Sequence, residues 1–303
     1  MPAAAIATLD ARTWRARRDA HEARIAGWLA PHLDRRSRGQ THPVEDFLFT
    51  YYTYRPAALR RWHPGLGVRL DDGAEAYDGR RGYLVDRIAG TAWADPGLAR
   101  QRHAQVQWIR DLLAAIESRP PEVGCFGLHE WAMIYRQRPD ELRHDAHPLR
   151  LGSGGTDTVV EQHRINCTHF DAFRFFTDPA RPRNRLQPTR DSQQTLDQPG
   201  CLHTTMDLYK WSYKLSPLTP SEIVADCFAL AREVRQVDMQ AAPYDLSEHD
   251  VEPIRIETVA GKQEYVARQR DFAERAAPLR RRLIRICDSA LVSARQPAVE
   301  ARA

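Results

Sequence analysis

TVAGKQEYVARQRDFAERAAPLRRRLIRICDSALVS, residues 258–293, decides the fold class, because apolar residues recur along it at helical spacing. On one continuous helix, Tyr265, Phe272, Leu279 and Leu283 would lie on the same side. Such a stripe can be buried only against other elements, since one helix cannot enclose its own apolar face. The stretch therefore predicts a long helix packed into a mainly helical protein.

Helical spacing extends to other parts of the chain. It predicts helices over residues 9–34, 98–118 and 202–215. Thr219, Pro220 and Glu222 have the spacing of a capping box, with Thr as the N-cap, Pro at the first helical position and Glu at the third. A further helix is therefore expected to start there and to continue to about Asp238.

Residues 64–97 differ from these helical stretches, because they contain seven glycines and are rich in turn signals. They are the most favourable place for short strands or irregular loops. The expected fold is mainly α, a single globular helical domain with a few short strands or irregular loops. Residues 1–40 would form an N-terminal helix, 41–293 a helical catalytic core continuous with it, and 294–303 a disordered tail.

The bulk composition is that of an ordinary globular protein. The 303 residues are 42% hydrophobic and 28% charged, and a net charge of +4 permits a polyanionic partner without requiring one. Five cysteines without a CxxC pair argue against a disulfide framework and against a zinc site made of cysteines. No secretory signal and no membrane span are expected, because no long apolar run occurs, so the expected location is the cytoplasm.

Lysine is rare in this chain, with three lysines against forty-one arginines. Abundant arginine then says little about function. A retained lysine is informative, because lysine can deprotonate or attack an electrophile. On the predicted helix 202–215, Asp207, Lys210 and Trp211 would share one face, so a carboxylate, an ammonium and an indole could together handle a nucleobase. The alternative is an ordinary ion pair beside a buried tryptophan.

Two segments combine histidine with acidic residues. His129 and Glu130 lie in an apolar stretch and should be at least partly buried, so each needs a specific partner. His169 could act as a general base or a metal ligand next to Asp171, although Asp171 can instead pair with Arg174. A helical metal site could draw on a wider set of nitrogen and oxygen donors, namely His129, Glu130, His169, Asp171, His203 and Asp207.

Aromatic residues interleaved with arginines form a further candidate, because bases stack on aromatic rings and phosphates pair with arginine. Trp62 and His63 precede a Pro-Gly turn and are better candidates for a site than Phe47, Phe49 and Tyr51, for which core packing is favoured. The candidate substrate-binding residues are Trp211, Tyr209, Trp62, His63, Tyr52 and Tyr244. No P-loop, GxGxxG, GxSxG or HExxH motif occurs, which disfavours Walker-type nucleotide hydrolysis and α/β-hydrolase chemistry.

A resemblance to a known family rests on five segments. They are HPVEDFLFTYY (42–52), CFGLHEWAMIYR (125–136), HFDAFRFF (169–176), QPGCLHTTMDLYKWSYKL (198–215) and DMQAAPYDL (238–246). They resemble a bacterial family whose members are labelled 3-methyladenine DNA glycosylase, and the resemblance extends from about residue 40 to residue 285. It implies hydrolysis of the N-glycosidic bond of an alkylated purine, for which an aromatic pocket and a carboxylate would suffice. It assigns no catalytic residue.

The leading hypothesis is a cytoplasmic, cofactor-free enzyme that removes alkylated purines from DNA. Its candidate catalytic residues are Asp207, Glu130, His169 and Lys210, with a carboxylate orienting water and Lys210 contacting phosphate or assisting as an acid. The alternative is a helical metal-dependent oxidase or small-molecule hydrolase. It would hold a divalent transition metal with His129, Glu130, His169 and Asp171. A third hypothesis is a nucleic-acid-binding protein without catalysis.

Overall fold

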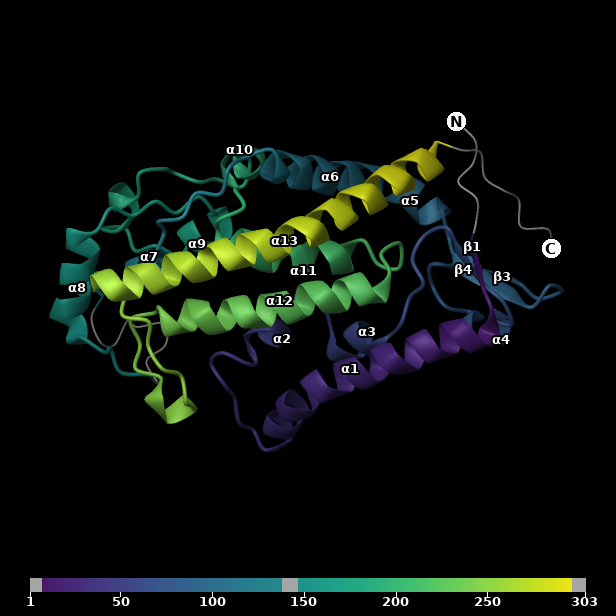
Figure 1. Cartoon of the computed structure of the whole chain (residues 1–303), viewed down its shortest axis with the longest axis horizontal. Helices are drawn as coiled ribbons and strands as arrows, with labels where there is room; N and C mark the ends of the chain where they lie inside the picture. The colour runs from purple at the N-terminus through teal and green to yellow at the C-terminus, as the bar shows by residue number, and fades with distance from the viewer. Residues whose placement is uncertain (1–6, 138–146, 296–303) are drawn as a thin grey trace. The chain divides into compact units, whose positions relative to one another are not determined.

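The computed structural model describes residues 7–137 and 147–295 (Figure 1). Within these residues, 13 α-helices and one four-stranded sheet confirm the predicted mainly α class. Residues 296–303, which make up most of the predicted disordered tail, lie outside the described part. No helix in the described part is both long and apolar enough to cross a lipid bilayer.

The chain divides into two compact units, each built from segments that are separate in the sequence. Unit 1 comprises Met1–Ala114, Leu208–Ala229 and Leu279–Ala303, and unit 2 comprises Ala115–Asp207 and Leu230–Pro278. Four helices contribute residues to both units, namely α6 (His103–Glu117), α11 (Leu202–Lys214), α12 (Ser221–Gln240) and α13 (Val259–Ala294). The predicted division into an N-terminal helix and one core stays a prediction.

The sheet belongs to unit 1. Its strands are β1 (Ala7–Leu9), β2 (Val68–Leu70), β3 (Tyr83–Asp86) and β4 (Thr91–Ala94), in the order β1-β2-β4-β3. β1 runs parallel to β2, and the other pairs are antiparallel. Three strands come from the glycine-rich segment 64–97, as expected. The sequence did not predict β1, because three residues are too few to reveal an alternating pattern.

Helix α1 (Ala11–Ser37) corresponds to the helix predicted over residues 9–34. It begins at Asp10, whose carboxylate accepts a hydrogen bond of 2.8 Å from the Thr13 amide. Its Trp14, Ile25 and Leu29 side chains are buried. Trp14 stacks on Trp62 with ring centroids 6.3 Å apart, and both belong to the core beneath the sheet. The remaining short helices of unit 1 are α2 (Phe47–Tyr51), α3 (Pro56–Arg60), α4 (Ala74–Tyr77) and α5 (Gly97–Gln101).

The long helices α11, α12 and α13 follow the predicted ranges closely. The prediction of a capping box at the start of α12 is wrong. The hydroxyl of Thr219 has no hydrogen-bond partner among the described residues. The Glu222 carboxylate does not turn back to the helix start, because it accepts hydrogen bonds from the Trp62 indole and the Arg17 guanidinium. Tertiary partners have replaced the local cap.

Unit 2 joins short helices through loops. It contains α7 (Leu128–Ala132), α8 (Gly152–Gln162), α9 (Phe170–Phe173) and α10 (Gln193–Leu196), besides its parts of the long helices. Buried polar side chains order the loops. The Asn184 amide group accepts from the Cys167 backbone N–H and donates to the Cys167 carbonyl, at 2.7 and 2.9 Å. Arg119 donates to the backbone carbonyls of Asp197 and Gln194.

Candidate metal centre

A tight turn directs His129 and Glu130 into the interior of unit 2. Phe126 and Gly127 both have positive φ, 49° and 69°, and α7 begins directly after them. The left-handed conformation at Gly127 favours glycine, and a Cβ atom there would make a tight contact of 3.0 Å with the Ala241 side chain. His129 is 1% exposed and Glu130 is 5% exposed as a result.

The start of α11 is fixed in a similar way. The Gln198 carboxamide oxygen accepts hydrogen bonds from the backbone N–H groups of Glu122 and Gly200, and its amide nitrogen donates to the Glu122 carbonyl. A Cβ on Gly200 would collide with the Glu122 backbone. These contacts hold the chain just before α11, a helix on which His203 and Asp207 lie four residues apart and therefore share one face.

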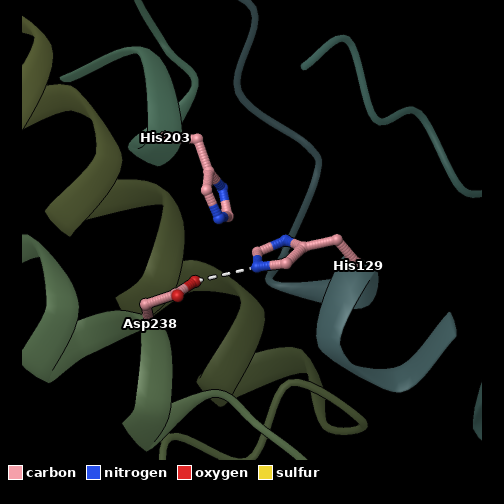
Figure 2. A group of neighbouring side chains, drawn as sticks. All are labelled: His129, His203 and Asp238. Atoms are coloured by element: carbon pink, nitrogen blue, oxygen red, sulfur yellow. Dashed lines mark ion pairs between the residues drawn. The ribbon is translucent and has the colours of Figure 1, made fainter. Parts of the chain in front are cut away.

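Three side chains from different helices meet inside unit 2: His129 from α7, His203 from α11 and Asp238 from α12 (Figure 2). One donor atom of each residue lies within 4.8 Å of the donor atoms of the other two. His129 and Asp238 are 1% and 0% exposed, and His203 is half-buried. The His129 and His203 rings are nearly perpendicular, with centroids 4.5 Å apart.

The contact between His129 and Asp238 is short but is not a well-formed hydrogen bond. His129 Nε2 lies 3.0 Å from Asp238 Oδ1, yet both atoms lack a hydrogen-bond partner of acceptable geometry among the described residues. With metal–ligand bonds of about 2.0–2.2 Å, two neighbouring ligands of one ion lie about 3.0–3.5 Å apart. The pair therefore has the spacing of two ligands on one metal ion.

Burial and the Asp238 carboxylate also determine how His129 and His203 are protonated in the metal-free protein. Burial alone would lower the pKa of His129, but the nearby Asp238 carboxylate outweighs burial and raises that pKa well above its usual range. Burial, reinforced by the neighbouring His129, holds the pKa of His203 well below its usual range. In the absence of a metal, His129 is an imidazolium paired with Asp238, whereas His203 is neutral and keeps a lone pair for binding.

Glu130 belongs to a different interaction from the one that the sequence suggested. Arg235 donates to Glu130 Oε1 at 3.2 Å and to Asp238 Oδ2 at 2.9 Å. Both contacts are buried, so Arg235 offsets two carboxylates that would otherwise be costly to desolvate. Glu130 therefore holds Arg235 rather than completing the histidine group, and Arg235 fixes Asp238 with Oδ1 toward His129.

A second group of possible ligands comprises His169, Asp171 and Asp207. His169 Nδ1 lies 3.1 Å from Asp197 Oδ1, and His169 Nε2 lies 3.7 Å from Asp207 Oδ2. Asp171 is half-buried and also lies 3.5 Å from the Arg174 guanidinium, as the structural alternative predicted. The four residues predicted as one metal centre therefore separate, with His129 in one group, His169 and Asp171 in another, and Glu130 in neither.

A cavity of about 10 Å³ adjoins the first group, which is space for one water molecule. Its lining includes His129, His203, Tyr265 and three cysteines, Cys125, Cys167 and Cys201. All five cysteines of the chain are free thiols. Burial raises the pKa of Cys201 to about 12, so this thiol stays protonated and is a poor metal ligand at neutral pH.

A larger open hollow of about 680 Å³ lies next to this cavity, because Glu122, Gly124 and Asn166 line both. Arg164 and Arg185 also line the hollow. Arg185 lies 3.9 Å from Glu122 and donates to the Asn166 side chain at 3.0 Å. The hollow and the cavity beside the buried histidines therefore share one wall.

The predicted stacking residues lie in unit 1, apart from Tyr244. Trp62, Tyr52 and Tyr209 are at most 4% exposed, and Trp211 is 5% exposed. Tyr209 packs edge-on against Tyr52, Tyr213 and Phe228, so its ring faces protein side chains. With so little surface open, these rings are core residues, and the stacking surface expected from the sequence is not formed in this structure.

The remaining predicted site residues are divided between the two units. A hydrogen bond of 2.5 Å joins His63 Nδ1 and the Tyr83 hydroxyl. Burial lowers the pKa of His63 to about 3. The Lys210 ammonium lies 4.5 Å from the Trp211 ring centroid, in unit 1. Tyr244, in unit 2, is 3% exposed and forms a backbone bridge with Leu149. Asp207 is the one member of the predicted Asp-Lys-Trp face that lies in unit 2.

Sequence reasoning missed Asp238, Arg235 and Asp197. Arg235 and Asp238 are three residues apart on a helix, a spacing typical of surface ion pairs, so nothing marked them as buried. The spacing of His203 and Asp207 on a predicted helix was a usable signal, because it places an imidazole and a carboxylate on one face. Searches of protein-family models, of curated proteins and of solved structures found no match to this chain.

Proposed function

We propose that unit 2 is a metal-dependent hydrolase of small molecules that binds one zinc ion through His129, His203 and Asp238. The observation that carries the proposal is the convergence of these three buried donors within 4.8 Å of one another. Two histidines and one carboxylate form a ligand set that catalytic zinc sites use, with a further position left for water or substrate. The unpartnered atoms His129 Nε2 and Asp238 Oδ1 fit such an ion.

The surrounding residues favour a redox-inert ion over iron or copper. The thiols of Cys125, Cys167 and Cys201 line the adjoining cavity, and an oxidising centre would expose them to sulfenic acid formation. Zinc, when bound, would lower the pKa of a water molecule to near neutrality and so supply a nucleophile. Arg235 would keep Asp238 oriented, because it already holds the other carboxylate oxygen.

The hollow beside the cavity supports a small-molecule substrate. Its volume of about 680 Å³ falls within the usual range of small-ligand sites. Arg164 and Arg185 line it, and their guanidinium groups suit a phosphate or carboxylate group on the substrate. We therefore infer an anionic substrate whose scissile bond is reached from this hollow.

The test is hydrolysis of p-nitrophenyl phosphate and p-nitrophenyl acetate by tag-free protein. We expect activity that a chelator removes, that Zn²⁺ restores, and that His129→Ala and His203→Ala abolish. His103→Ala is the matched control, because His103 is an exposed histidine at the start of α6. Equal hydrolysis in His129→Ala and His103→Ala would contradict the proposal. Stoichiometric iron in place of zinc would instead favour a metal-dependent oxidase.

We also propose a second candidate, a cytoplasmic DNA glycosylase that releases 3-methyladenine. It draws on the family resemblance and on Asp207, a buried carboxylate 3.7 Å from His169 Nε2, which could orient an attacking water molecule. The experiment is release of 3-methyladenine from methylated duplex DNA in the presence of a chelator. Release that Asp207→Asn abolishes supports this candidate, and the same background rate in wild type and variant excludes it.

A further inference from the structure

The second ligand group lies close to the first. Helix α11 provides His203 to the first group and Asp207 to the second, one helical turn or about 6 Å apart along the helix axis. The rings of His203 and His169 are stacked at 20°, with centroids 5.5 Å apart. The two groups are therefore neighbours within unit 2.

His169 has the environment of a metal-binding histidine. Its Nδ1 atom lies 3.1 Å from Asp197 Oδ1, while its Nε2 atom is directed to the side where Asp207 lies. Metal-binding histidines usually donate their second N–H to a carboxylate, which fixes the tautomer and the ring orientation. His169 and Asp197 are 1% and 2% exposed, so this arrangement is built into the core of the unit.

The distance between His169 and Asp207 supports the same conclusion. His169 Nε2 and Asp207 Oδ2 are 3.7 Å apart, too far for a hydrogen bond, and Asp171 contributes a third donor within 4.8 Å of both. A cation can be accommodated among donors at this spacing after small side-chain shifts. One imidazole and two carboxylates make a donor set suited to a divalent transition ion.

The buried charges also match a second cation. Among the described residues of unit 2, the buried carboxylates are Glu130, Asp197, Asp207 and Asp238, and the buried cations are Arg235 and the His129 imidazolium. Arg235 contacts Glu130 and Asp238, which belong to the surroundings of the first group. Asp197 and Asp207 both lie beside His169, and a divalent ion bound there would place positive charge next to two buried carboxylates.

We propose that unit 2 binds a second divalent metal ion through His169, Asp171 and Asp207, with Asp197 as the positioning residue. The inference extends the proposed function to a centre with two adjacent ions, in which the second ion would help to bind an anionic substrate group. It can be tested separately, because the two ligand groups share no residue.

The experiment measures metal content without any activity assay. Chelated full-length protein is equilibrated with Zn²⁺, passed through a desalting column and analysed for zinc per chain. We expect two zinc ions in wild type, one in His129→Ala, one in Asp207→Asn and one in Asp171→Asn. Asp178→Asn is the matched control and should keep two, because the Asp178 side chain is fully exposed. Circular dichroism tests whether each variant is folded, and Asp171→Asn keeps the shape of the side chain that it replaces.

The outcomes separate the two proposals. One ion in wild type that is lost in His129→Ala but kept in Asp171→Asn overturns the second site and leaves the proposed hydrolase centre intact. One ion that is lost in Asp171→Asn but kept in His129→Ala supports the second site and overturns the first. Two ions that remain in both Asp207→Asn and Asp171→Asn overturn the second site, and a wild type without zinc overturns both.

Discussion

Unit 1 and unit 2 bury different kinds of side chain. The core of unit 1 beneath the sheet is aromatic and aliphatic, with Trp14 stacked on Trp62 and Tyr77 packed edge-on against Trp14. Among the residues that the structure describes, unit 1 buries a single carboxylate, Asp46, whereas unit 2 buries four. Burial of a carboxylate is costly unless a cation accompanies it. The two units therefore differ in how much buried negative charge their described residues carry.

The geometry of the buried charges matters more than their number. In unit 1, Asp46 accepts well-formed hydrogen bonds from Arg35 and from the His42 backbone, and it pairs with His32 at 2.9 Å. In unit 2, Asp238 Oδ1 and His129 Nε2 approach to 3.0 Å without forming such a bond. A buried carboxylate with complete hydrogen bonds is structural, and one with an unpartnered oxygen near two imidazoles has a donor available to a ligand.

The largest expected effect concerns the aromatic core of unit 1. Trp62→Ala removes a ring that is 1% exposed and should lower the free energy of unfolding by about 3–5 kcal/mol, because it leaves a large cavity. Urea unfolding followed by fluorescence measures the loss. The zinc content of the folded variant should be that of wild type. A variant that keeps full stability, or that loses its metal while folded, would contradict the separation between an aromatic core in unit 1 and a metal centre in unit 2.

The next effect concerns the charges of unit 2. In metal-free protein, Asp238→Asn removes the carboxylate that accompanies Arg235 and His129, and it should cost about 3–5 kcal/mol. The corresponding change in unit 1, Asp46→Asn, should cost about 1–3 kcal/mol, because the partner Arg35 keeps some exposure to water. Urea titration of both variants gives the comparison. A larger loss of unfolding free energy for Asp46→Asn than for Asp238→Asn would contradict this prediction.

The orientation of His169 provides a smaller test. Asp197→Asn keeps the shape of the side chain but weakens the contact with His169 Nδ1 at 3.1 Å. Loss of such an outer partner typically weakens metal binding about 10–100-fold. Competition with a chromophoric chelator should reveal this change for one ion only, with the other ion unaffected. An unchanged affinity for both ions would show that Asp197 does not position a ligand.

The pH dependence of stability distinguishes the histidines of the two units. The folded pKa of His63 is lowered to about 3, so unfolded protein takes up a proton below about pH 6.5 that folded protein does not. Stability is therefore lost as pH falls, by about 1–2 kcal/mol between pH 7 and pH 5. His63→Gln should make this dependence shallower. An equally steep loss in the variant would contradict the burial of a neutral His63.

His129 should have the opposite effect on the pH dependence of stability. Its folded pKa is raised, so the stabilisation by its proton is complete below the unfolded value and is lost as pH rises through the folded pKa. In metal-free protein, His129→Gln should therefore remove a stability loss on the alkaline side. Urea midpoints between pH 6 and pH 9, for wild type and variant, measure this difference. A wild type that gains stability with pH relative to the variant would contradict the ion pair with Asp238.

The sequence predicts the long helices well because their signal is local. The periodic apolar residues of 258–293 require no knowledge of tertiary contacts, and α13 follows them almost residue for residue. The glycine-rich segment likewise contains three of the four strands. The capping box failed because Glu222 has stronger partners in Trp62 and Arg17, which are distant in the sequence.

The site could be predicted only in part, since its partners come from distant segments. His129 was expected to be buried because of its apolar surroundings, and it is buried; His169, named as a possible base or metal ligand, is buried as well. Asp238 lies 109 positions after His129, and its spacing from Arg235 is that of a common surface ion pair. Trp62 and Tyr209 look equally suited to stacking a base and to filling a core, and only their exposed fractions separate the two roles.

The most direct test of the central claim is the zinc content of wild type and His203→Ala after equilibration with Zn²⁺ and desalting. His203 is half-buried, and no hydrogen bond joins it to another described side chain, so its removal should perturb the fold little. The account predicts one zinc ion fewer per chain in the variant, with an unchanged circular dichroism spectrum. Equal zinc content in wild type and His203→Ala would contradict a metal centre at His129, His203 and Asp238.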